Sequence, residues 1–452
     1  MQSFTSTVEQ QLGAPLPNPA LQLLIALKNL YPGSQHVAIV ESLCPQFPVL
    51  KYLDFAGIPY TPLDAETHNA YVHDQESNSV VPRSITGVMA FTYEGVQLRV
   101  FEASWRRDRE SLRFVDFVFD GKDDGMGRKL LSAVYEWANS LREEMWVFEN
   151  GGWSKHKDLF RAVQKSTWDD IVLDENFREG LRRDTKTFFS SKEIYQSLGV
   201  TWKRGLLLLG PPGNGKTESI KALLHEFDYA ALYVKSINTS MGPEFGVRAV
   251  FEHARKHAPC ILVLEDLDSM ITDKVRSFFL NEIDGLAQNE GILTIATTNH
   301  PELIDDAILN RPSRFDVKYD FALPTAELRN EFATKWLRKV YALDTGIVFQ
   351  KSIEELASAI ADKTNAWSFA FLKELFVSFL LRIAHDKSLG KDTILPADEI
   401  LLDQVEKLAL QIIKIKEGKG KVGEDDADQG TGHVVRRFRM AQRVTEAHPL
   451  NL

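Results

Sequence analysis

The stretch Leu206-Leu207-Leu208-Leu209-Gly210-Pro211-Pro212-Gly213-Asn214-Gly215-Lys216-Thr217 decides the fold. Its four leucines predict a strand that is buried on both faces, and its last eight residues fit the phosphate-binding pattern Gly-x-x-x-x-Gly-Lys-Ser/Thr. The glycines let backbone amides approach phosphate oxygens, and the helix that follows adds its positive N-terminal end. The stretch therefore predicts a nucleotide-phosphate site, rather than a glycine-rich turn that only joins a strand to a helix.

Two side chains of this loop carry specific chemistry. Lys216 would supply a point charge for the outer phosphates, and the Thr217 hydroxyl would face a magnesium ion. An amphipathic helix follows the loop, with Ile220 and Leu223 on one face. The predicted binding residues are Gly210, Pro211, Pro212, Gly213, Asn214, Gly215, Lys216, Thr217 and Glu218.

The composition describes a soluble globular protein with several domains. The chain has 452 residues, enough for about three domains, and 44% of them are hydrophobic. A net charge of −10 provides no basic field for a nucleic acid, and no apolar run reaches the roughly 20 residues that cross a bilayer. Two cysteines, Cys44 and Cys260, suggest neither a metal site nor a disulfide framework. We expect an intracellular, cytoplasmic protein with no signal peptide and no membrane span.

Periodicity divides the chain into four regions. Residues 165–323 alternate strands with helices, which predicts an α/β fold: a P-loop NTPase core whose parallel sheet carries helices on both faces. Residues 324–415 predict a helical lid, with a last helix over 396–416. Residues 416–452 predict a disordered tail, because 416–432 is rich in Gly, Lys and Asp, and 434–439 is basic.

Residues 1–164 predict an α+β accessory domain. Strand patterns at 88–93 and 96–101 flank Glu94-Gly95, which is a hairpin signal. A third strand is expected at 112–119, followed by a helix that places Leu130 and Val134 on one face. Nothing in this region indicates catalysis, and its aromatic residues are expected in the core rather than in a ligand cage.

Polar residues follow two of the predicted core strands. Glu265-Asp266 comes directly after the strand at 260–264, and Thr297-Thr298-Asn299 ends the strand that starts at Ile292. One carboxylate should lie beside Thr217 and steady magnesium through its water shell, and the next should orient and polarise an attacking water. The Asn299 amide could hold that water or a γ-phosphate oxygen. A polar turn without catalytic use is the alternative for Asn299.

Two arginines, Arg311 and Arg314, lie far beyond the loop in the sequence. If they are too distant from their own site, they would reach the γ-phosphate of a neighbouring subunit. The alternative is that they are surface arginines paired with Asp305 or Asp316. Spacing alone leaves both interpretations open.

The order of these motifs resembles the AAA ATPase family, over about residues 165 to 385. The resemblance implies a homo-oligomeric ring, usually a hexamer, that binds ATP with Mg²⁺ at subunit interfaces. It also implies a role for each residue: Glu265 as the magnesium-side acid together with Thr217, Asp266 as the catalytic acid, Asn299 as the sensor, and Arg311 and Arg314 as arginine fingers.

Two further segments resemble parts of the same family. Trp168-Asp169-Asp170-Ile171 is similar to the segment whose backbone meets adenine, near Ile171. Trp367-Ser368-Phe369-Ala370 stands where the lid helix contributes small residues near the ribose, although it is bulkier here.

The chain also departs from the usual family pattern. The usual order at the acidic strand end is Asp-Glu, whereas this chain has Glu265-Asp266. This inversion resembles the clade of the mitochondrial translocase of the Rieske iron-sulfur protein, but without the membrane helix of such a translocase. In the loop 236–246, Ser240-Met241-Gly242 or Phe245-Gly246 replaces the aromatic-hydrophobic-glycine triplet of peptide-threading members.

These observations predict an ATPase that couples its cycle to the remodelling or chaperoning of an unidentified protein client held by residues 1–164. One alternative is a nucleotide-gated binding scaffold with little or no hydrolysis, which the inverted acid pair favours. Another is a small-molecule phosphotransferase, which would need neither Arg311 nor Arg314 and would act as a monomer.

Overall fold

The computed structural model describes residues 19–42, 47–63, 68–74, 78–107, 110–284, 289–309, 311, 313–343, 347–388 and 396–424. The chain forms two compact units. Unit 1 comprises Met1–Arg161 and Ser236–Ala249, and unit 2 comprises Ala162–Lys235 and Val250–Leu452. The sequence did not suggest that residues 236–249 group with the N-terminal region. The division into an accessory domain, a core and a lid stays a prediction.

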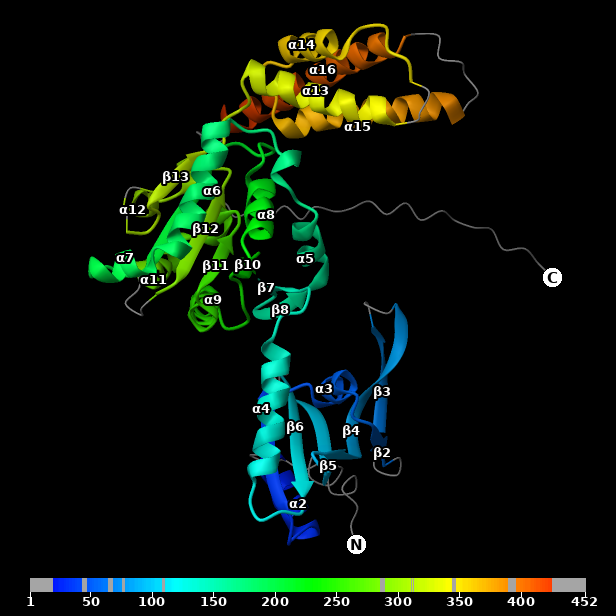
Figure 1. The fold of residues 1–452 in the computed structure, drawn as a ribbon, viewed down its shortest axis with the longest axis vertical. Coiled ribbons are helices and arrows are strands. Elements are labelled where there is room, and N and C mark those ends of the chain that lie inside the picture. The colour runs from blue at the N-terminus through cyan, green and yellow to red at the C-terminus, as the bar shows by residue number, and fades with distance from the viewer. Residues whose placement is uncertain are drawn as a thin grey trace, which may run out of the picture. The chain divides into compact units, whose positions relative to one another are not determined.

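Unit 1 contains an antiparallel sheet with the strand order β1-β6-β5-β4-β2, in which β3 also pairs with β4 (Figure 1). Its strands are β1 (Gln35–Ser42), β2 (Tyr60–Pro62), β3 (His68–Asp74), β4 (Ser79–Tyr93), β5 (Val96–Arg107) and β6 (Glu110–Phe119). The predicted hairpin is confirmed, because Tyr93 pairs with Val96 across a turn in which Glu94 and Gly95 both have positive φ.

Both faces of this sheet are covered. Alternate residues of β6 point to opposite faces, so that Val115 and Phe117 join one hydrophobic core and Phe114 and Val118 join another. Helices α3 (Val49–Ala56) and α4 (Gly125–Asn139) pack on the first face, and α2 (Pro19–Leu30) packs on the second. Unit 1 also contains β7 (Met145–Glu149), β8 (Gly152–His156) and most of α5 (Lys157–Gln164), which the sequence did not indicate.

Unit 2 contains the predicted parallel sheet, and the α/β fold is confirmed. Its strands run in the order β13-β9-β12-β11-β10, and each neighbouring pair is parallel. Their bounds are β9 (Lys203–Leu209), β10 (Ala230–Val234), β11 (Cys260–Leu264), β12 (Ile292–Thr298) and β13 (Val317–Asp320). All residues of β11 and β12 are buried, as expected of strands covered on both faces. The carboxyl ends of β9, β11 and β12 therefore meet at one edge of the sheet.

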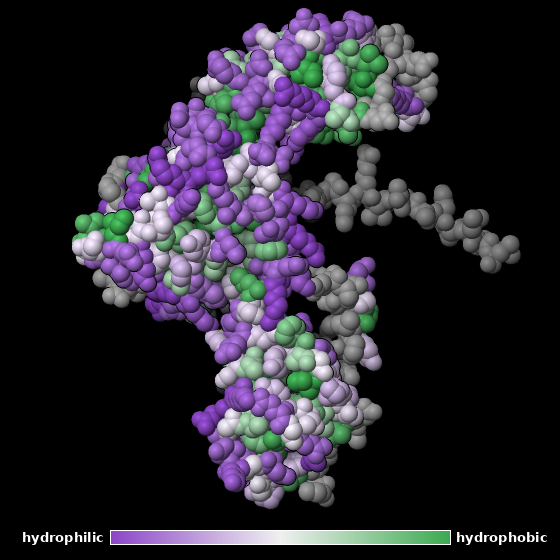
Figure 2. Space-filling view, viewed as in Figure 1, coloured by the Kyte–Doolittle hydropathy of each residue, from purple (hydrophilic) through white to green (hydrophobic). Residues whose placement is uncertain are grey.

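Helices flank this sheet (Figure 1). They are α6 (Glu175–Ser190), α7 (Lys192–Ser197), α8 (Lys216–Glu226), α10 (Leu267–Met270), α11 (Asp273–Asp284) and α12 (Asp306–Leu309), together with residues 250–257 of α9 (Pro243–His257), whose first residues belong to unit 1. Asp174 caps α6 by accepting a hydrogen bond from the Phe177 amide. The surface drawn in Figure 2 is mostly hydrophilic, and a hydrophobic group lies over α7, where Ile194 and Leu198 are exposed.

Four helices form the predicted helical region. They are α13 (Ala326–Ala342), α14 (Ile353–Lys363), α15 (Phe369–Ser388) and α16 (Ala397–Glu424), which share one hydrophobic core. A capping box between Ser352 and Glu355 starts α14. The predicted end of α16 at Lys416 was wrong, because the helix continues to Glu424. Lys and Glu residues between the glycines favour helix, and no proline stops it.

The predicted disorder of the tail after Glu424, including the basic residues 434–439, lies outside the described residues. Among the helices that the structure describes, none is both long enough and apolar enough to cross a membrane.

Candidate functional site

A cavity of about 740 Å³ lies at the carboxyl edge of the unit 2 sheet. Its volume is in the range of small-molecule and cofactor sites. Its lining residues are Lys165, Ser166, Thr167, Asp170, Ile171, Val172, Pro212, Gly213, Gly215, Lys216, Thr217, Glu218, Asp266, Thr297, Asn299, Phe332, Lys335, Trp336, Lys339, Phe369, Ala370 and Lys373.

The predicted phosphate loop joins β9 to α8 and forms one wall of this cavity. Gly213 has φ +80°, and a Cβ there would lie 2.6 Å from the Ala370 side chain, so the loop requires glycine at this position. The Ala370 amide donates a hydrogen bond to the Gly213 carbonyl over 3.0 Å. This contact fixes the loop against the start of α15. Residues 367–370, which the family resemblance placed near the ribose, lie at this point.

Lys216 lies at the start of α8 and is buried. Its ammonium group donates to the carbonyl oxygens of Gly210 and, over 3.0 Å, Pro211. Burial lowers the pKa of Lys216, and the Asp266 carboxylate opposes this shift. A buried cation whose partners are neutral carbonyls is suited to bind an anion that enters the cavity.

The Thr217 hydroxyl donates to Glu265 Oε1 over 2.7 Å, which brings the two predicted magnesium-site residues together. No cluster of three or more His, Cys, Asp or Glu side chains that could hold a metal occurs in the described part of the chain. Magnesium usually binds one or two carboxylates, several waters and substrate phosphates rather than an all-protein cage. A hydroxyl and a carboxylate beside a phosphate loop therefore fit Mg²⁺ that arrives with a nucleotide.

Asp266 and Asn299 also lie together, as predicted from the neighbouring strand ends. The Asn299 side-chain amide donates to Asp266 Oδ1 over 2.9 Å, and the Asp266 backbone amide donates to Thr297 Oγ1 over 3.0 Å. Asp266 has φ +51° and ψ +55°, a left-handed conformation that is uncommon outside glycine. Such backbone conformations concentrate at functional sites, which agrees with a catalytic position for Asp266.

The opposite wall of the cavity was largely missed from the sequence. It is formed by aromatic and lysine side chains of α13 and α15, including Phe332, Trp336 and Lys335. Burial lowers the pKa of Lys335. The helical spacing of Phe332 and Trp336 is the same as that of core residues, so their position beside a ligand could not be read from the pattern.

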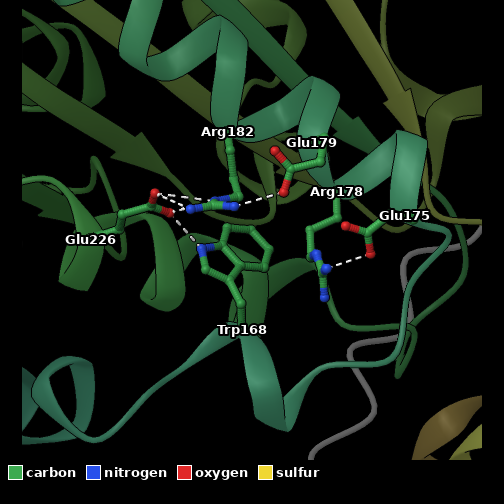
Figure 3. Close-up of polar contacts among 6 residues, drawn as sticks. All are labelled: Trp168, Glu175, Arg178, Glu179, Arg182 and Glu226. Carbon is green, nitrogen blue, oxygen red and sulfur yellow. Dashed lines mark hydrogen bonds and ion pairs between the residues drawn. The ribbon is translucent and has the colours of Figure 1, made fainter.

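The segment of residues 165–172, here called the linker segment, connects the two walls. The Trp168 indole donates to Glu226 Oε2 over 2.7 Å, and the Arg182 guanidinium binds the same carboxylate. Figure 3 shows this arrangement, with the Arg182 side chain between Glu226 and Glu179. The bond from Arg182 lowers the pKa of Glu226, with a further contribution from the indole. Trp168 is thus attached to α8 and α6 of the sheet region.

The residues after Trp168 attach the linker segment to the helical region. Asp170 forms an ion pair of 3.1 Å with Lys339 of α13, which lowers the pKa of Asp170. Ile171 lines the cavity, and Val172 is buried in the core formed by α13–α16. Within residues 168–172, side chains therefore contact the sheet region, the cavity and the helical region.

The two predicted arginine fingers differ in environment, and neither is among the residues that line the cavity. The Arg314 side chain is 5% exposed and binds both oxygens of Asp284 over 3.0 and 2.8 Å, whereas the Arg311 side chain is 60% exposed and lies 3.4 Å from Asp284. The alternative partners were wrong: Asp305 pairs with Arg276, and Asp316 accepts from the Gly205 amide. Whether either arginine acts on a neighbouring subunit stays a prediction.

A parallel sheet, a glycine-rich phosphate loop after β9, two carboxylates after β11 and an amide after β12 define a P-loop nucleotide-binding domain. Comparison with known proteins places that domain more narrowly. Residues 206–323 match the model of the ATPase family associated with various cellular activities (AAA), so this segment of the chain is similar to the ATPase domain of that family.

Several curated proteins are similar to this chain. The ATPase family gene 2 protein of Saccharomyces cerevisiae is 31% identical over 231 residues, which are 48% of this chain and 28% of that protein. The ATP-dependent zinc metalloprotease FtsH 2 of Salinibacter ruber is 29% identical over 270 residues, 55% of this chain and 38% of that protein. Protein SAV of Sulfolobus acidocaldarius is 28% identical over 242 residues, 50% of this chain and 30% of that protein. The matches thus span less than two fifths of each relative.

Proposed function

We propose that this chain binds ATP in the 740 Å³ cavity and hydrolyses it to ADP and phosphate. The observation that carries the proposal is the pairing of two contacts at one sheet edge: Thr217 with Glu265, and Asp266 with Asn299. The first pair supplies oxygen ligands beside the phosphate loop, and the second supplies a base and an amide where a water would attack.

Each residue of the site has a role in this proposal. The amides of the phosphate loop and the Lys216 ammonium bind the phosphates, while Ile171 and the aromatic wall of α13 contact the base. Mg²⁺, when bound with the nucleotide beside Thr217 and Glu265, neutralises charge on the phosphates. Asp266 accepts the proton of the attacking water, and Asn299 holds that water in line with the γ-phosphate.

We further propose that the active form is a homo-oligomer, such as the hexameric ring that the family resemblance implies. Arg311 is the more suitable finger, because its side chain is exposed while that of Arg314 is buried on Asp284. The exposed apolar residues Ile194, on α7, and Leu198, directly after it, support a surface for protein contact.

The output of the cycle is proposed to be the remodelling or chaperoning of a protein client through unit 1. In that unit Met241 is 61% exposed and Phe245 is 39% exposed, so the loop that precedes and begins α9 offers apolar side chains to a partner. The inverted Glu265-Asp266 order and the β-rich N-terminal region support a relationship to the clade of the Rieske-protein translocase.

The test uses two inactive variants, Asp266→Asn and Arg311→Ala. Each alone should bind ATP with near wild-type affinity and release phosphate at least 100-fold more slowly, because a base contributes roughly 10²–10⁴ in rate and an arginine finger roughly 10³–10⁵. Mixed under conditions of subunit exchange, they should recover part of the activity, since some interfaces then join an intact Asp266 to an intact Arg311.

The outcomes separate the proposal from its alternatives. Mixtures that stay inactive at every ratio, with exchange confirmed by labelled subunits, would remove the role of Arg311 between subunits. A wild-type protein that binds ATP and Mg²⁺ without phosphate release would instead be a nucleotide-gated scaffold. A monomer that transfers phosphate to a small molecule and is insensitive to Arg311→Ala would be a phosphotransferase.

A further inference from the structure

A residue outside the predicted motifs contacts the magnesium-side carboxylate. The Tyr233 hydroxyl, on β10, donates a hydrogen bond to Glu265 Oε2, while Thr217 donates to Oε1 of the same carboxylate over 2.7 Å. Both oxygens of Glu265 are therefore engaged, one by a residue of the phosphate loop and the other by a residue of the neighbouring strand. Two donors on one carboxylate fix both its position and the orientation of its plane.

The strand register explains how Tyr233 reaches this position. β10 and β11 are parallel, and Tyr233 pairs with Val263, two residues before Glu265. Residues two apart in a strand point to the same face, and a tyrosine ring is long enough to extend past Val263 toward the strand end. Tyr233 is 7% exposed, so its hydroxyl has little access to water.

The chemistry of the two groups sets the direction of this hydrogen bond. A phenol hydroxyl has a proton to donate, whereas an ionised carboxylate can only accept, so Tyr233 is the donor and Glu265 the acceptor.

We propose that Tyr233 is a positioning residue that sets the Glu265 carboxylate for magnesium. The inverted order of the acid pair explains why such a residue is needed, because it places a glutamate instead of an aspartate at the magnesium-side position. Glu265 is longer than an aspartate by one methylene, about 1.5 Å, and has one more rotatable bond, whose freedom costs entropy when it is fixed. The hydrogen bond from Tyr233 holds the longer Glu265 side chain in one orientation. The carboxylate of an aspartate at position 265 would be too far from the Tyr233 hydroxyl to accept this bond. This inference rests on the proposed binding of ATP with Mg²⁺.

The test measures nucleotide binding rather than turnover. The affinity of a non-hydrolysable ATP analogue is measured with EDTA and over a Mg²⁺ titration, for wild type and Tyr233→Phe. The phenylalanine keeps the ring and removes the hydroxyl. We expect unchanged affinity in EDTA and a Mg²⁺ half-saturation raised on the order of 10-fold, as for other residues that orient metal ligands.

The chain offers a matched control in Tyr319→Phe. Tyr319 is 8% exposed, and its hydroxyl donates to Asp184 over 2.7 Å, away from the described cavity lining. This variant should leave the Mg²⁺ half-saturation at the wild-type value. In a Glu265→Gln background, Tyr233→Phe should raise the Mg²⁺ half-saturation by less than a further twofold, because Tyr233 acts through the Glu265 carboxylate.

Three results would overturn the inference. They are a Tyr233→Phe half-saturation within twofold of wild type, an equal loss of affinity with and without Mg²⁺, and full additivity with Glu265→Gln. If wild type fails to bind the analogue at all, the proposed function fails together with this inference. A wild type that binds, with a Tyr233→Phe variant that behaves identically, overturns the role of Tyr233 alone.

Discussion

The polar side chains at the two ends of strand β9 differ in how completely the protein pairs them. At the carboxyl end, the Lys216 ammonium has only loop carbonyls as described hydrogen-bond partners, and Asn214 Oδ1 is buried without a partner in the described structure. At the amino end, the Lys203 ammonium donates to the carbonyls of Ile283 and Asp284, and Arg314 binds Asp284 through two bonds.

This difference separates a binding site from a structural network. Buried polar groups in a fold are normally paired, and an unpaired one needs a reason such as a ligand. The amino end borders a cavity of about 370 Å³, but the charge of Arg314 that lines it is already matched by the Asp284 carboxylate. The carboxyl end leaves hydrogen-bonding capacity for phosphate oxygens. Function is therefore expected at the carboxyl end and stability at the amino end.

Lys216→Ala should produce the largest effect and should act on binding alone. Removal of the cation that meets the phosphates should weaken ATP binding on the order of 1,000-fold or more, which corresponds to about 4 kcal/mol. The free energy of unfolding should change by less than about 1 kcal/mol, because the fold already disfavours the charged form of Lys216. Calorimetric titration with ATP and chemical denaturation measure the two quantities.

A folded Lys216→Ala protein that binds ATP like wild type would show that the phosphates lie elsewhere. Lys221→Ala is the matched control, because Lys221 lies on the same helix and pairs with the largely exposed Glu218. That variant should leave ATP affinity within about threefold of wild type.

The sequence predicted which residues meet at the carboxyl end, because those residues lie in short continuous stretches. The phosphate loop is one run of residues, and Glu265, Asp266 and Asn299 each follow a buried strand that periodicity identifies. Tyr233, Trp336 and the Trp168 contact were not predicted, because each depends on side chains that meet only after folding. A tyrosine in a buried strand looks the same in sequence whether it packs in a core or holds a carboxylate.

At the amino end, the environment of Arg314 could not be predicted from the sequence. Arg314 follows a family motif, and that resemblance implied a role toward another subunit, whereas the structure buries its side chain on Asp284 of the same chain. Spacing does not reveal burial, and the partner lies on α11, well before the motif in sequence. A motif can therefore indicate that a residue matters without indicating whether it stabilises the fold or serves the reaction.

Arg314→Ala should mainly reduce stability. Removal of one partner of a largely buried ion pair should lower the free energy of unfolding by about 2–3 kcal/mol at pH 7. Arg314 lowers the pKa of Asp284 in the folded state, so the contribution is present above the unfolded-state pKa and is lost as pH falls through the folded value. The difference in the free energy of unfolding between Arg314→Ala and wild type should therefore shrink below about pH 4. Chemical denaturation at several pH values measures this difference.

Arg276→Ala is the control for this prediction. Arg276 also pairs with an aspartate, Asp305, over 2.6 Å, but its side chain is 38% exposed, so its removal should cost less than about 1 kcal/mol. Equal losses for the two variants would contradict the distinction between buried and exposed pairs. Wild-type stability for Arg314→Ala, combined with lost hydrolysis, would restore Arg314 as a finger.

The smallest effect is expected at Trp168, whose indole attaches the linker segment to Glu226 of α8. Trp168→Phe keeps the aromatic ring but removes the indole N–H that donates to Glu226. The linker segment should then position Ile171 less firmly, and ATP binding should weaken by about 2- to 5-fold, the equivalent of one hydrogen bond of about 0.5–1 kcal/mol. The maximal rate should stay the same, because Trp168 touches none of the reacting groups.

Trp153→Phe supplies the control, since the Trp153 indole donates to the Ala249 carbonyl within unit 1 and should not affect ATP affinity. Glu226→Gln changes the acceptor of the same hydrogen bond and also removes the ion pair between Glu226 and Arg182. If Trp168 acts through Glu226, the double variant Trp168→Phe/Glu226→Gln should bind ATP no more weakly than Glu226→Gln alone. Additive losses would show that Trp168 contributes through its ring packing instead. A changed maximal rate with unchanged affinity would place the linker segment in the chemical step and not in binding.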